Sequence, residues 1–433
     1  MSTLEQLRRG ELAGARRLDL CGGLEQVPED VFALADSLEV LNLNGNRLRD
    51  LPKDMGRLHR LRVLFCSGNP FEHLPESLGD CGALEMVGFK SCQIGVVPAN
   101  ALPMPLRWLI LTDNRIERLP ASLGERPRLQ KLMLAGNRLQ ALPDSLADAQ
   151  ALELLRLSAN DLSMLPDWLP RLPKLAWLAV SGNPLGWETT RPGALPLRHW
   201  SELRLGPRLG EGASGVIHRV ESVTGDGVRL ALKLFRGAVT SDGRPEDELL
   251  AHRCVGPHPG LCGLVAELTG HPEGASGMLL PLLPPDLENL ADPPSFETCT
   301  RDVYDGSLVL PPGAVGPMAL ALARVLAHMH RCGVPHGDFY AHNVLWNRQT
   351  HRLVLSDLGG ATLLPLDRPA LARALCSLDV RAWGILVEEL LARVAGQDGG
   401  DRLDRLRSLV NDCVQADPGR RPAMADVVSA LDG

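Results

Sequence analysis

The stretch "LQKLMLAGNRLQALPDSLADAQA", residues 129–151, carries the pattern that decides the fold of the first half of the chain. It reads L-x-x-L-x-L-x-x-N-x-L-x-x-L-P-x-x-L. Alternating leucines such as Leu132 and Leu134 turn one face of a short strand inward, and Asn137 at the ninth place can hydrogen-bond backbone groups of the following turn. A unit of 23 residues cannot bury its apolar face alone, so it must stack on similar neighbours.

The same pattern recurs over roughly residues 15–190. The units start at intervals of 23, 23, 22, 23, 23 and 23 residues, at Leu38, Leu61, Leu84, Leu106, Leu129, Leu152 and Leu175. A degenerate unit before Leu38 makes about eight repeats. These units resemble the leucine-rich repeat family, which implies an α/β solenoid with its strands on the concave side. We expect this domain at residues 1–190.

The third, fifth and seventh residues of each unit should point outward from the strands. Several of them are too apolar for a merely solvated surface: Phe65, Trp108, Ile110, Met133 and Trp177. An aromatic and methionine-rich strip on a concave sheet indicates a face that binds a protein partner. The alternative is that the second domain folds back and covers part of the strip.

Composition narrows the class of protein. The net charge is -7 and no basic run of five residues occurs, which argues against nucleic-acid binding. The first residues are charged where a signal peptide is apolar, and no 18 consecutive residues are apolar, so we expect a cytoplasmic protein without a membrane span. The ten cysteines form no C-x-x-C pair, which argues for reduced thiols rather than a zinc site or disulfides.

The repeat ends before a glycine-rich segment. We expect a linker at 191–200 and a second domain at 201–433, in which Gly210, Gly212 and Gly215 form G-x-G-x-x-G. A dinucleotide-binding loop of this form opens a helix. Here a β-branched run at 216–220, a "TGDG" turn at 224–227 and the strand-like "VRLALKLF" follow, so the loop lies in a hairpin. This hairpin resembles the glycine loop that covers the nucleotide in protein kinases.

Further kinase motifs follow in the order of that family. "LALK" ends at Lys233, which is the only lysine between residues 186 and 433 and suits a need for a compact ammonium on phosphates. "PEDELLAHR" offers Glu246 and Glu248 as its carboxylate partner, and the spacing to "HPGL" favours Glu248. The resemblance implies that Leu209, Ile217, Ala231 and Leu345 line the adenine site.

The segment "HGDFYAHNVLW", residues 336–346, keeps the histidine, the aspartate and the five-residue step to asparagine of the kinase catalytic loop. The resemblance implies that Asp338 accepts or orients the substrate hydroxyl, and that Asn343 and Asp357 of "VLSDLGG" hold Mg²⁺ beside ATP. It also implies that Asp379 braces the catalytic loop. The expected architecture is a bilobal α+β kinase-like domain with a small lobe at 201–282 and a large lobe at 283–433.

Two positions of the catalytic loop depart from the family pattern. Gly337 replaces the arginine that grips a phosphorylated activation loop, and Tyr340 stands where Ser/Thr kinases have a lysine. Asp379 follows Asp357 by only 22 positions, and no A-P-E follows. We expect an Mg·ATP-dependent Ser/Thr-type kinase that acts on a protein recruited by the repeats. The alternatives are a pseudokinase scaffold, a kinase of a small molecule, and a protein in which only the repeats function.

Overall fold

The computed structural model describes residues 3–433 except 213–214, 224–228, 238, 241 and 397–399. The chain forms two compact units, Met1–Lys174 with Asn183–Leu185, and Leu175–Gly182 with Gly186–Gly433. The strand of the last repeat therefore groups with the second unit and not with the repeats that precede it. The predicted division into 1–190, 191–200 and 201–433 stays a prediction about folding domains.

The repeats form a parallel sheet with one short strand per repeat. The strands are β1 (Arg17–Asp19), β2 (Val40–Asn42), β3 (Val63–Phe65), β4 (Met86–Gly88), β5 (Trp108–Ile110), β6 (Lys131–Met133), β7 (Leu154–Arg156) and β8 (Trp177–Ala179), in that order across the sheet. From β2 on, each strand covers the third to fifth residues of its repeat, and β1 to β7 pair in register. The predicted leucine-rich repeat solenoid is confirmed.

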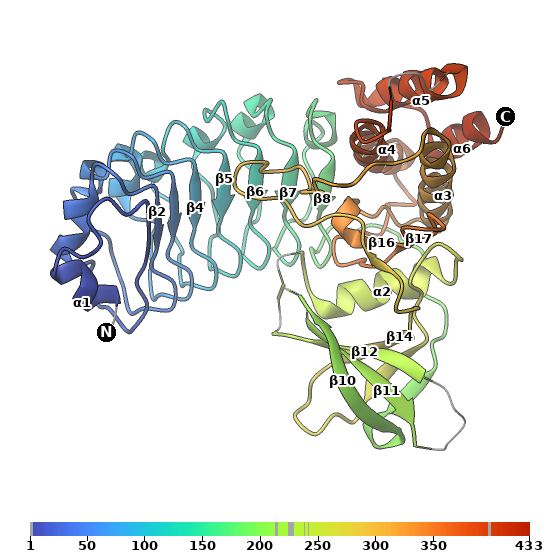
Figure 1. Ribbon diagram of the computed structural model, residues 1–433, viewed down its shortest axis with the longest axis horizontal. Coiled ribbons are helices and arrows are strands. Elements are labelled where there is room, and N and C mark those ends of the chain that lie inside the picture. Colours follow the sequence, from blue (N-terminus) through green and yellow to red (C-terminus); the bar gives the residue numbers. More distant parts are fainter. Residues whose placement is uncertain (1–2, 213–214, 224–228, 238, 241, 397–399) are drawn as a thin grey trace. The chain divides into compact units, whose positions relative to one another are not determined.

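Short helical turns form the other side of the first unit (Figure 1). They are the helix α1 (Thr3–Arg8) and the 3-10 turns η1 (Glu29–Leu34), η2 (Met55–Arg57), η3 (Glu76–Asp80), η4 (Ala99–Ala101), η5 (Ala121–Leu123), η6 (Asp144–Asp148) and η7 (Leu169–Arg171). Most of these turns follow a proline, which cannot donate a backbone hydrogen bond and so suits the start of a helical turn. Repeat leucines such as Leu129, Leu132 and Leu134 are fully buried between the two sides.

The ninth residue of each repeat links neighbouring repeats through buried hydrogen bonds. The Asn137 amide donates to the carbonyl oxygens of Leu111 and Leu134, both at 2.9 Å, and accepts from the amide of Ile116 at 3.0 Å. Cys92 takes this place in the repeat that begins at Leu84, and its thiol donates to the carbonyl of Cys66. One side chain thus satisfies backbone groups that the short strands leave without partners.

Replacing Asn137 with alanine should lower the free energy of unfolding by about 2–4 kcal/mol, because two carbonyls and one amide would stay buried without partners. The measurement is urea denaturation followed by circular dichroism. Asn100→Ala is the matched control. Asn100 is exposed, and the bond that its side chain makes is to the carboxylate of Glu76, which is also exposed. Equal losses in both variants would contradict the role assigned to Asn137.

The second unit contains a six-stranded sheet in the order β10-β11-β12-β14-β13-β9. Its strands are β9 (Leu197–His199), β10 (Leu203–Glu211), β11 (Gly215–Ser222), β12 (Arg229–Phe235), β13 (Ala266–Thr269) and β14 (Gly277–Pro281), with η8 (Trp200–Glu202) before β10. The helix α2 (Pro245–Val255) accompanies this sheet (Figure 1). The predicted "TGDG" turn at 224–227 lies outside the described residues.

The rest of the second unit is largely helical. It comprises β15 (Glu288–Asn289), α3 (Pro312–Arg331), η9 (Ala341–Asn343), β16 (Val344–Trp346), β17 (Leu353–Leu355), α4 (Pro369–Leu391), α5 (Gly400–Cys413), η10 (Pro418–Arg420) and α6 (Met424–Asp432). Helices α3 and α4 bury apolar faces against each other, with Trp383 fully buried and its indole nitrogen donating to the carbonyl of Ala319. A mixed sheet followed by a helical part confirms the expected kinase-like fold.

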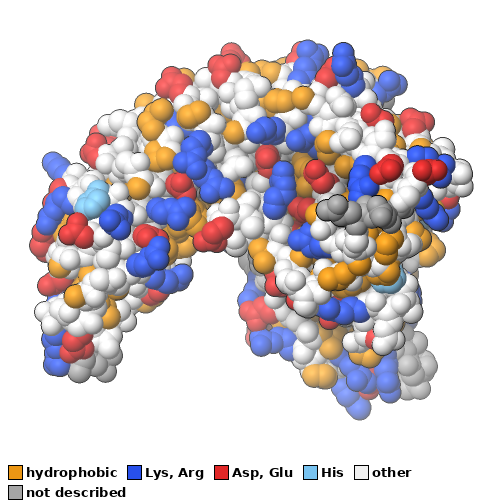
Figure 2. All heavy atoms as spheres, turned by 45° about the horizontal axis from the view of Figure 1, so that its top comes forward, with side chains coloured by type: hydrophobic (Ala, Val, Ile, Leu, Met, Phe, Trp, Pro, Cys, Tyr) orange, Lys and Arg blue, Asp and Glu red, His pale blue; other side chains and the backbone are white. Residues whose placement is uncertain are grey.

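None of the helices described combines the length and the apolarity that a bilayer span requires. On the face drawn in Figure 2, basic and acidic side chains are interspersed.

Candidate active site

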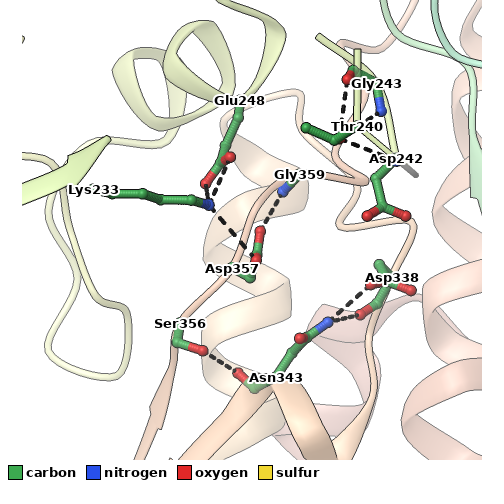
Figure 3. A network of polar contacts seen from close by, with 10 residues as sticks. All are labelled: Lys233, Thr240, Asp242, Gly243, Glu248, Asp338, Asn343, Ser356, Asp357 and Gly359. Atoms are coloured by element: carbon green, nitrogen blue, oxygen red, sulfur yellow. Dashed lines mark hydrogen bonds and ion pairs between the residues drawn. The ribbon is translucent and has the colours of Figure 1, made fainter. Parts of the chain in front are cut away.

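Lys233 lies in the middle of the six-stranded sheet and reaches toward α2. Its strand, β12, is flanked by β11 and β14, where its register partners are Ile217 and Met278. Its ammonium lies 2.6 and 2.8 Å from the two carboxylate oxygens of Glu248 on α2, and 3.7 Å from a carboxylate oxygen of Asp357 (Figure 3). Glu248, rather than Glu246, is thus the partner of this lysine.

Two carboxylates stabilise the buried Lys233 ammonium. The side chains of Lys233 and Glu248 are 7% and 3% exposed, whereas that of Asp357 is 38% exposed. Burial acts to lower the pKa of Lys233, but Asp357 and Glu248 raise it above its usual value. Burial and the nearby Asp357 raise the pKa of Glu248 to about 7, with Lys233 opposing them. The lysine therefore stays charged, and Asp357 is the carboxylate with access to solvent.

Two of the three motif glycines leave open space, and the third is tightly enclosed. Gly210 and Gly212 have no atom near the place of a Cβ, and residues 213–214 between them and Gly215 lie outside the described residues. A Cβ on Gly215 would collide with the carbonyl oxygen of Leu234 on β12. The predicted hairpin of β10 and β11 is present, with Gly210 opposite Ile217.

An apolar cluster lies beside the lysine. It joins Ala231, Phe235, Cys262, Met278, Leu280 and Val354, with Ile217 packed against them. Leu345 on β16 is half-buried and is the cross-strand partner of Val354 on β17. Leu209 is 51% exposed and lies outside the cluster. The structure thus brings Ile217, Ala231 and Leu345 to one apolar region and leaves Leu209 at the hairpin's surface.

The catalytic-loop residues form a second polar group below the first (Figure 3). The Asn343 side-chain nitrogen donates to the backbone carbonyl and to a carboxylate oxygen of Asp338, both at 2.9 Å. The amide and the hydroxyl of Ser356 both donate to the Asn343 carbonyl at 2.9 Å, which fixes the neighbouring Asp357 beside the loop. Asp357 in turn accepts from the Gly359 amide at 2.8 Å.

The donor set at this point suits magnesium. Asp357 supplies a carboxylate, and Asn343 supplies its amide oxygen because its nitrogen is committed to Asp338. Burial acts to raise the pKa of Asp357, but Lys233 and the Gly359 amide hold it below its usual value, so the carboxylate is ionised. Mg²⁺ prefers oxygen ligands and is often held by one or two protein groups together with water and phosphate oxygens. The described residues form no cluster of three or more carboxylate, histidine or cysteine ligands.

Two residues of the site, His330 and Asp242, were not predicted from the sequence. Asp379 on α4 accepts from the backbone amides of His336 at 2.6 Å and Gly337 at 3.0 Å, and also lies 2.9 Å from the His330 ring on α3. Asp379 was predicted as the brace, but its partner His330 was missed. Asp242 was also missed, and its carboxylate faces the site from the side opposite Lys233 (Figure 3). The only sequence signal for His330 is its place in the last turn of an otherwise apolar helix.

The predicted partner-binding strip is not uniform. Phe65, Trp108, Ile110 and Met133 are half-buried in the first unit. Trp177 is only 1% exposed and lies against the catalytic loop, so its assignment to an open binding face is wrong. The reason is that the Trp177 ring packs within the second unit. This is the alternative in which the second domain covers part of the strip.

Comparisons with known proteins agree with the division of the chain into repeats and a kinase-like part. Residues 37–58, 105–162 and 127–185 match the leucine rich repeat family, and residues 288–370 match the lipopolysaccharide kinase (Kdo/WaaP) family. The chain is 30% identical over 114 residues to the probable inactive serine/threonine-protein kinase roco10 of Dictyostelium discoideum, which covers 25% of this chain and 4% of that protein. It is 48% identical over 59 residues to TMV resistance protein N of Nicotiana glutinosa, covering 13% of this chain and 5% of that protein.

The match to a third relative also covers only a small part of both chains. Leucine-rich repeat and calponin homology domain-containing protein 1 of Homo sapiens is 27% identical over 99 residues, 23% of this chain and 14% of that protein. The chain therefore spans only a small part of the length of these relatives. The two sets of family matches and the two structural parts lead to one conclusion: the chain is an array of leucine-rich repeats joined to a kinase-like domain.

Proposed function

We propose that this protein is a kinase that transfers the γ-phosphate of ATP, with Mg²⁺, to a serine or threonine hydroxyl of a protein that the repeats recruit. The observation that carries the proposal is the Lys233 ammonium held between Glu248 and Asp357, with Asp338 and Asn343 directly below (Figure 3). Phosphoryl transfer needs few reacting protein groups and depends on positioning and on charge, which this arrangement supplies.

Each residue of the site has a role in this proposal. Lys233 binds the nucleotide phosphates, and Glu248 holds it in place. Asn343 and Asp357 would hold Mg²⁺, which neutralises charge on the phosphates when bound. Asp338 orients the acceptor hydroxyl and takes its proton. The glycines Gly210, Gly212 and Gly215 cover the phosphates, and Leu209, Ile217, Ala231 and Leu345 contact the adenine.

The repeats supply the recruiting surface in this proposal. Phe65, Trp108, Ile110 and Met133 are the half-buried apolar residues of the concave face, and aromatic and methionine side chains are typical of protein interfaces. The ten cysteines are all free thiols, which fits a reducing compartment such as the cytoplasm.

A sugar hydroxyl is the second candidate acceptor. The match of residues 288–370 to a lipopolysaccharide kinase family covers the catalytic loop and Asp357. Helix α4 begins at Pro369, so only residues 358–368 lie between it and Asp357. A segment of this length offers little backbone on which a peptide could dock, which favours a compact acceptor.

The test is incubation of the full chain with γ-labelled ATP and Mg²⁺, with added proteins or with soluble oligosaccharides. We expect label on serine or threonine, identified by mass spectrometry, and a loss of about 10²- to 10⁴-fold in Asp338→Asn. Asp412→Asn, at an exposed carboxylate, is the control that should keep the wild-type rate. Label on oligosaccharide alone would support the second candidate. Wild-type protein that labels nothing would refute both and leave a nucleotide-binding scaffold.

A further inference from the structure

The strand of the last repeat lies against the catalytic loop. Trp177 on β8 and the loop belong to the same compact unit, although Phe339 follows Trp177 by 162 positions in the sequence. The Trp177 indole nitrogen donates to the carbonyl of Phe339 at 3.0 Å. Its ring stacks on Tyr340, with centroids 4.2 Å apart and planes inclined by 9°. Phe339 and Tyr340 directly follow Asp338, the residue placed at the acceptor hydroxyl.

Both departures of the loop from the kinase pattern face this strand. Gly337 has φ of +68°, and a Cβ there would collide with the carbonyl oxygens of Leu178 on β8 and of Gly360. A glycine is thus required where protein kinases have arginine. Tyr340, in the place of the lysine, supplies the ring on which Trp177 stacks. The two substitutions therefore make room for β8 and bind it.

The backbone directly after β8 is also bonded to the segment that follows Asp357. The amide of Val180 donates to the hydroxyl of Thr362 at 3.3 Å. The guanidinium of Arg301 lies 5.5 Å from the centre of the Trp177 ring, within the range of a cation–π contact. Trp177 is thus enclosed by the loop on which it acts, and it is 1% exposed.

Among the described contacts, three side chains from outside the catalytic loop bind it, and one of them comes from the last repeat. Asp379 binds the amides of His336 and Gly337. Asp302 binds the amide of His342 at 3.0 Å and its ring at 2.7 Å. Between these two points, the residues next to Asp338 are held by Trp177. Within the loop, the Asn343 side chain bonds to the Asp338 carboxylate, and from outside the loop Trp177 fixes the backbone directly after Asp338.

We propose that Trp177 is a positioning residue for Asp338, and that the last leucine-rich repeat is a structural part of the active site. In kinases that carry the arginine, a phosphorylated loop grips that position. Here packing and one hydrogen bond from β8 replace that grip, so the catalytic loop is ordered without phosphorylation. This inference rests on the proposed phosphoryl transfer for its kinetic consequence and on the contacts of β8 for its structural one.

The experiment compares Trp177→Leu, Trp177→Phe and Trp168→Leu in the full chain. Trp168 is the matched control because it is the N-cap residue of the preceding turn η7, outside the site and the partner strip, and its replacement removes the same ring. Trp177→Leu should lower kcat about 10- to 100-fold, because small displacements of a reacting group are costly. The KM for ATP should stay within about twofold, because Lys233 and Glu248 are not touched. Trp177→Phe keeps the stacked ring and loses the hydrogen bond. Its kcat should therefore lie between those of the wild type and Trp177→Leu.

Hydrogen exchange of the amides at 336–343 gives a second readout that needs no activity. We expect faster exchange there in Trp177→Leu and unchanged exchange in Trp168→Leu. If wild-type protein transfers no phosphate, the proposed function fails, and the exchange result alone decides whether Trp177 orders the loop. Unchanged kcat and unchanged exchange in Trp177→Leu would overturn the inference. So would equal effects of Trp177→Leu and Trp168→Leu, since these would reflect a general loosening of the fold.

Discussion

Replacing Lys233 with methionine should reduce phosphate transfer at least about 100-fold, because the variant lacks the positive charge next to the phosphates. The ammonium lies within 3.7 Å of Asp357 and within 2.8 Å of both Glu248 oxygens, so no other described cation occupies this place. Lys233 is the only lysine from residue 186 onward, so no second lysine in this part of the chain competes for the phosphate-binding role. The measurement is the initial rate of transfer from γ-labelled ATP.

The loss of charge must be separated from a loss of folding. Lys233→Met leaves the buried carboxylate of Glu248 without its ammonium, which costs about 3–5 kcal/mol for a buried pair of this kind. In the double variant Lys233→Met/Glu248→Gln the buried charge is gone as well. We expect it to recover most of the stability in thermal denaturation and none of the activity. This result would assign the kinetic effect to the ammonium itself.

Lys53→Met is the control, since Lys53 is exposed in the first unit and should have the wild-type rate. A Lys233→Met protein with more than half of the wild-type rate would contradict the phosphate-binding role. Activity recovered in the double variant would do the same, because it would mean that the single variant only misfolds.

The repeats could be predicted almost completely from the sequence, because their contacts are local. The ninth asparagine bonds within its own repeat and to the repeat before it, as Asn137 does with Leu134 and Leu111, the sixth residues of these two repeats. A fixed period of 22 or 23 residues therefore specifies both the strand and its neighbour. The kinase motifs were found in the same way, since each has a recognisable spacing along the chain.

The contact of β8 with the catalytic loop could not be predicted in this way. The third position of a repeat points out of the sheet in every repeat, so Trp108 and Trp177 carry the same sequence signal. One is half-buried in the first unit and the other is enclosed by Tyr340 in the second. What differs is the surface opposite each ring, and that depends on tertiary packing between segments far apart in the sequence. The exception was visible only indirectly, in the unusual Gly337 and Tyr340.

The Asp379→Ala variant should lose about 3–5 kcal/mol of stability, since Asp379 is a buried, charged acceptor with three partners. Its side chain is 1% exposed, and the His336 and Gly337 amides would remain without an acceptor. At about 2–4 °C per kcal/mol for a domain of this size, the melting temperature should fall by about 10 °C. Asp404→Ala is the control, because the Asp404 side chain is 72% exposed and pairs only across one helical turn with Arg407.

The stability lost in Asp379→Ala should depend on pH, and the protonation of His330 sets the direction of this dependence. Burial opposes its protonation, but Cys376 and Asp379 raise the pKa of His330 to about 10, above the value of 6.5 for an unperturbed histidine. A raised pKa adds stability that is complete below about pH 6.5 and disappears as the pH rises through about 10. Burial acts to raise the pKa of Asp379, but His330 holds it below its usual value, so Asp379 stays ionised throughout this range.

The difference in stability between wild type and Asp379→Ala should therefore be largest near pH 6 and shrink toward pH 10. Urea denaturation at several pH values measures it. His330→Asn provides the matched variant, in which the effect of Asp379→Ala should no longer change with pH over this range. A difference that grows between pH 6 and 10 would contradict a protonated His330. A difference that is flat in the wild-type background would show that the amides of His336 and Gly337, rather than the ion pair, carry the stabilisation, and that the loop is braced by hydrogen bonds alone.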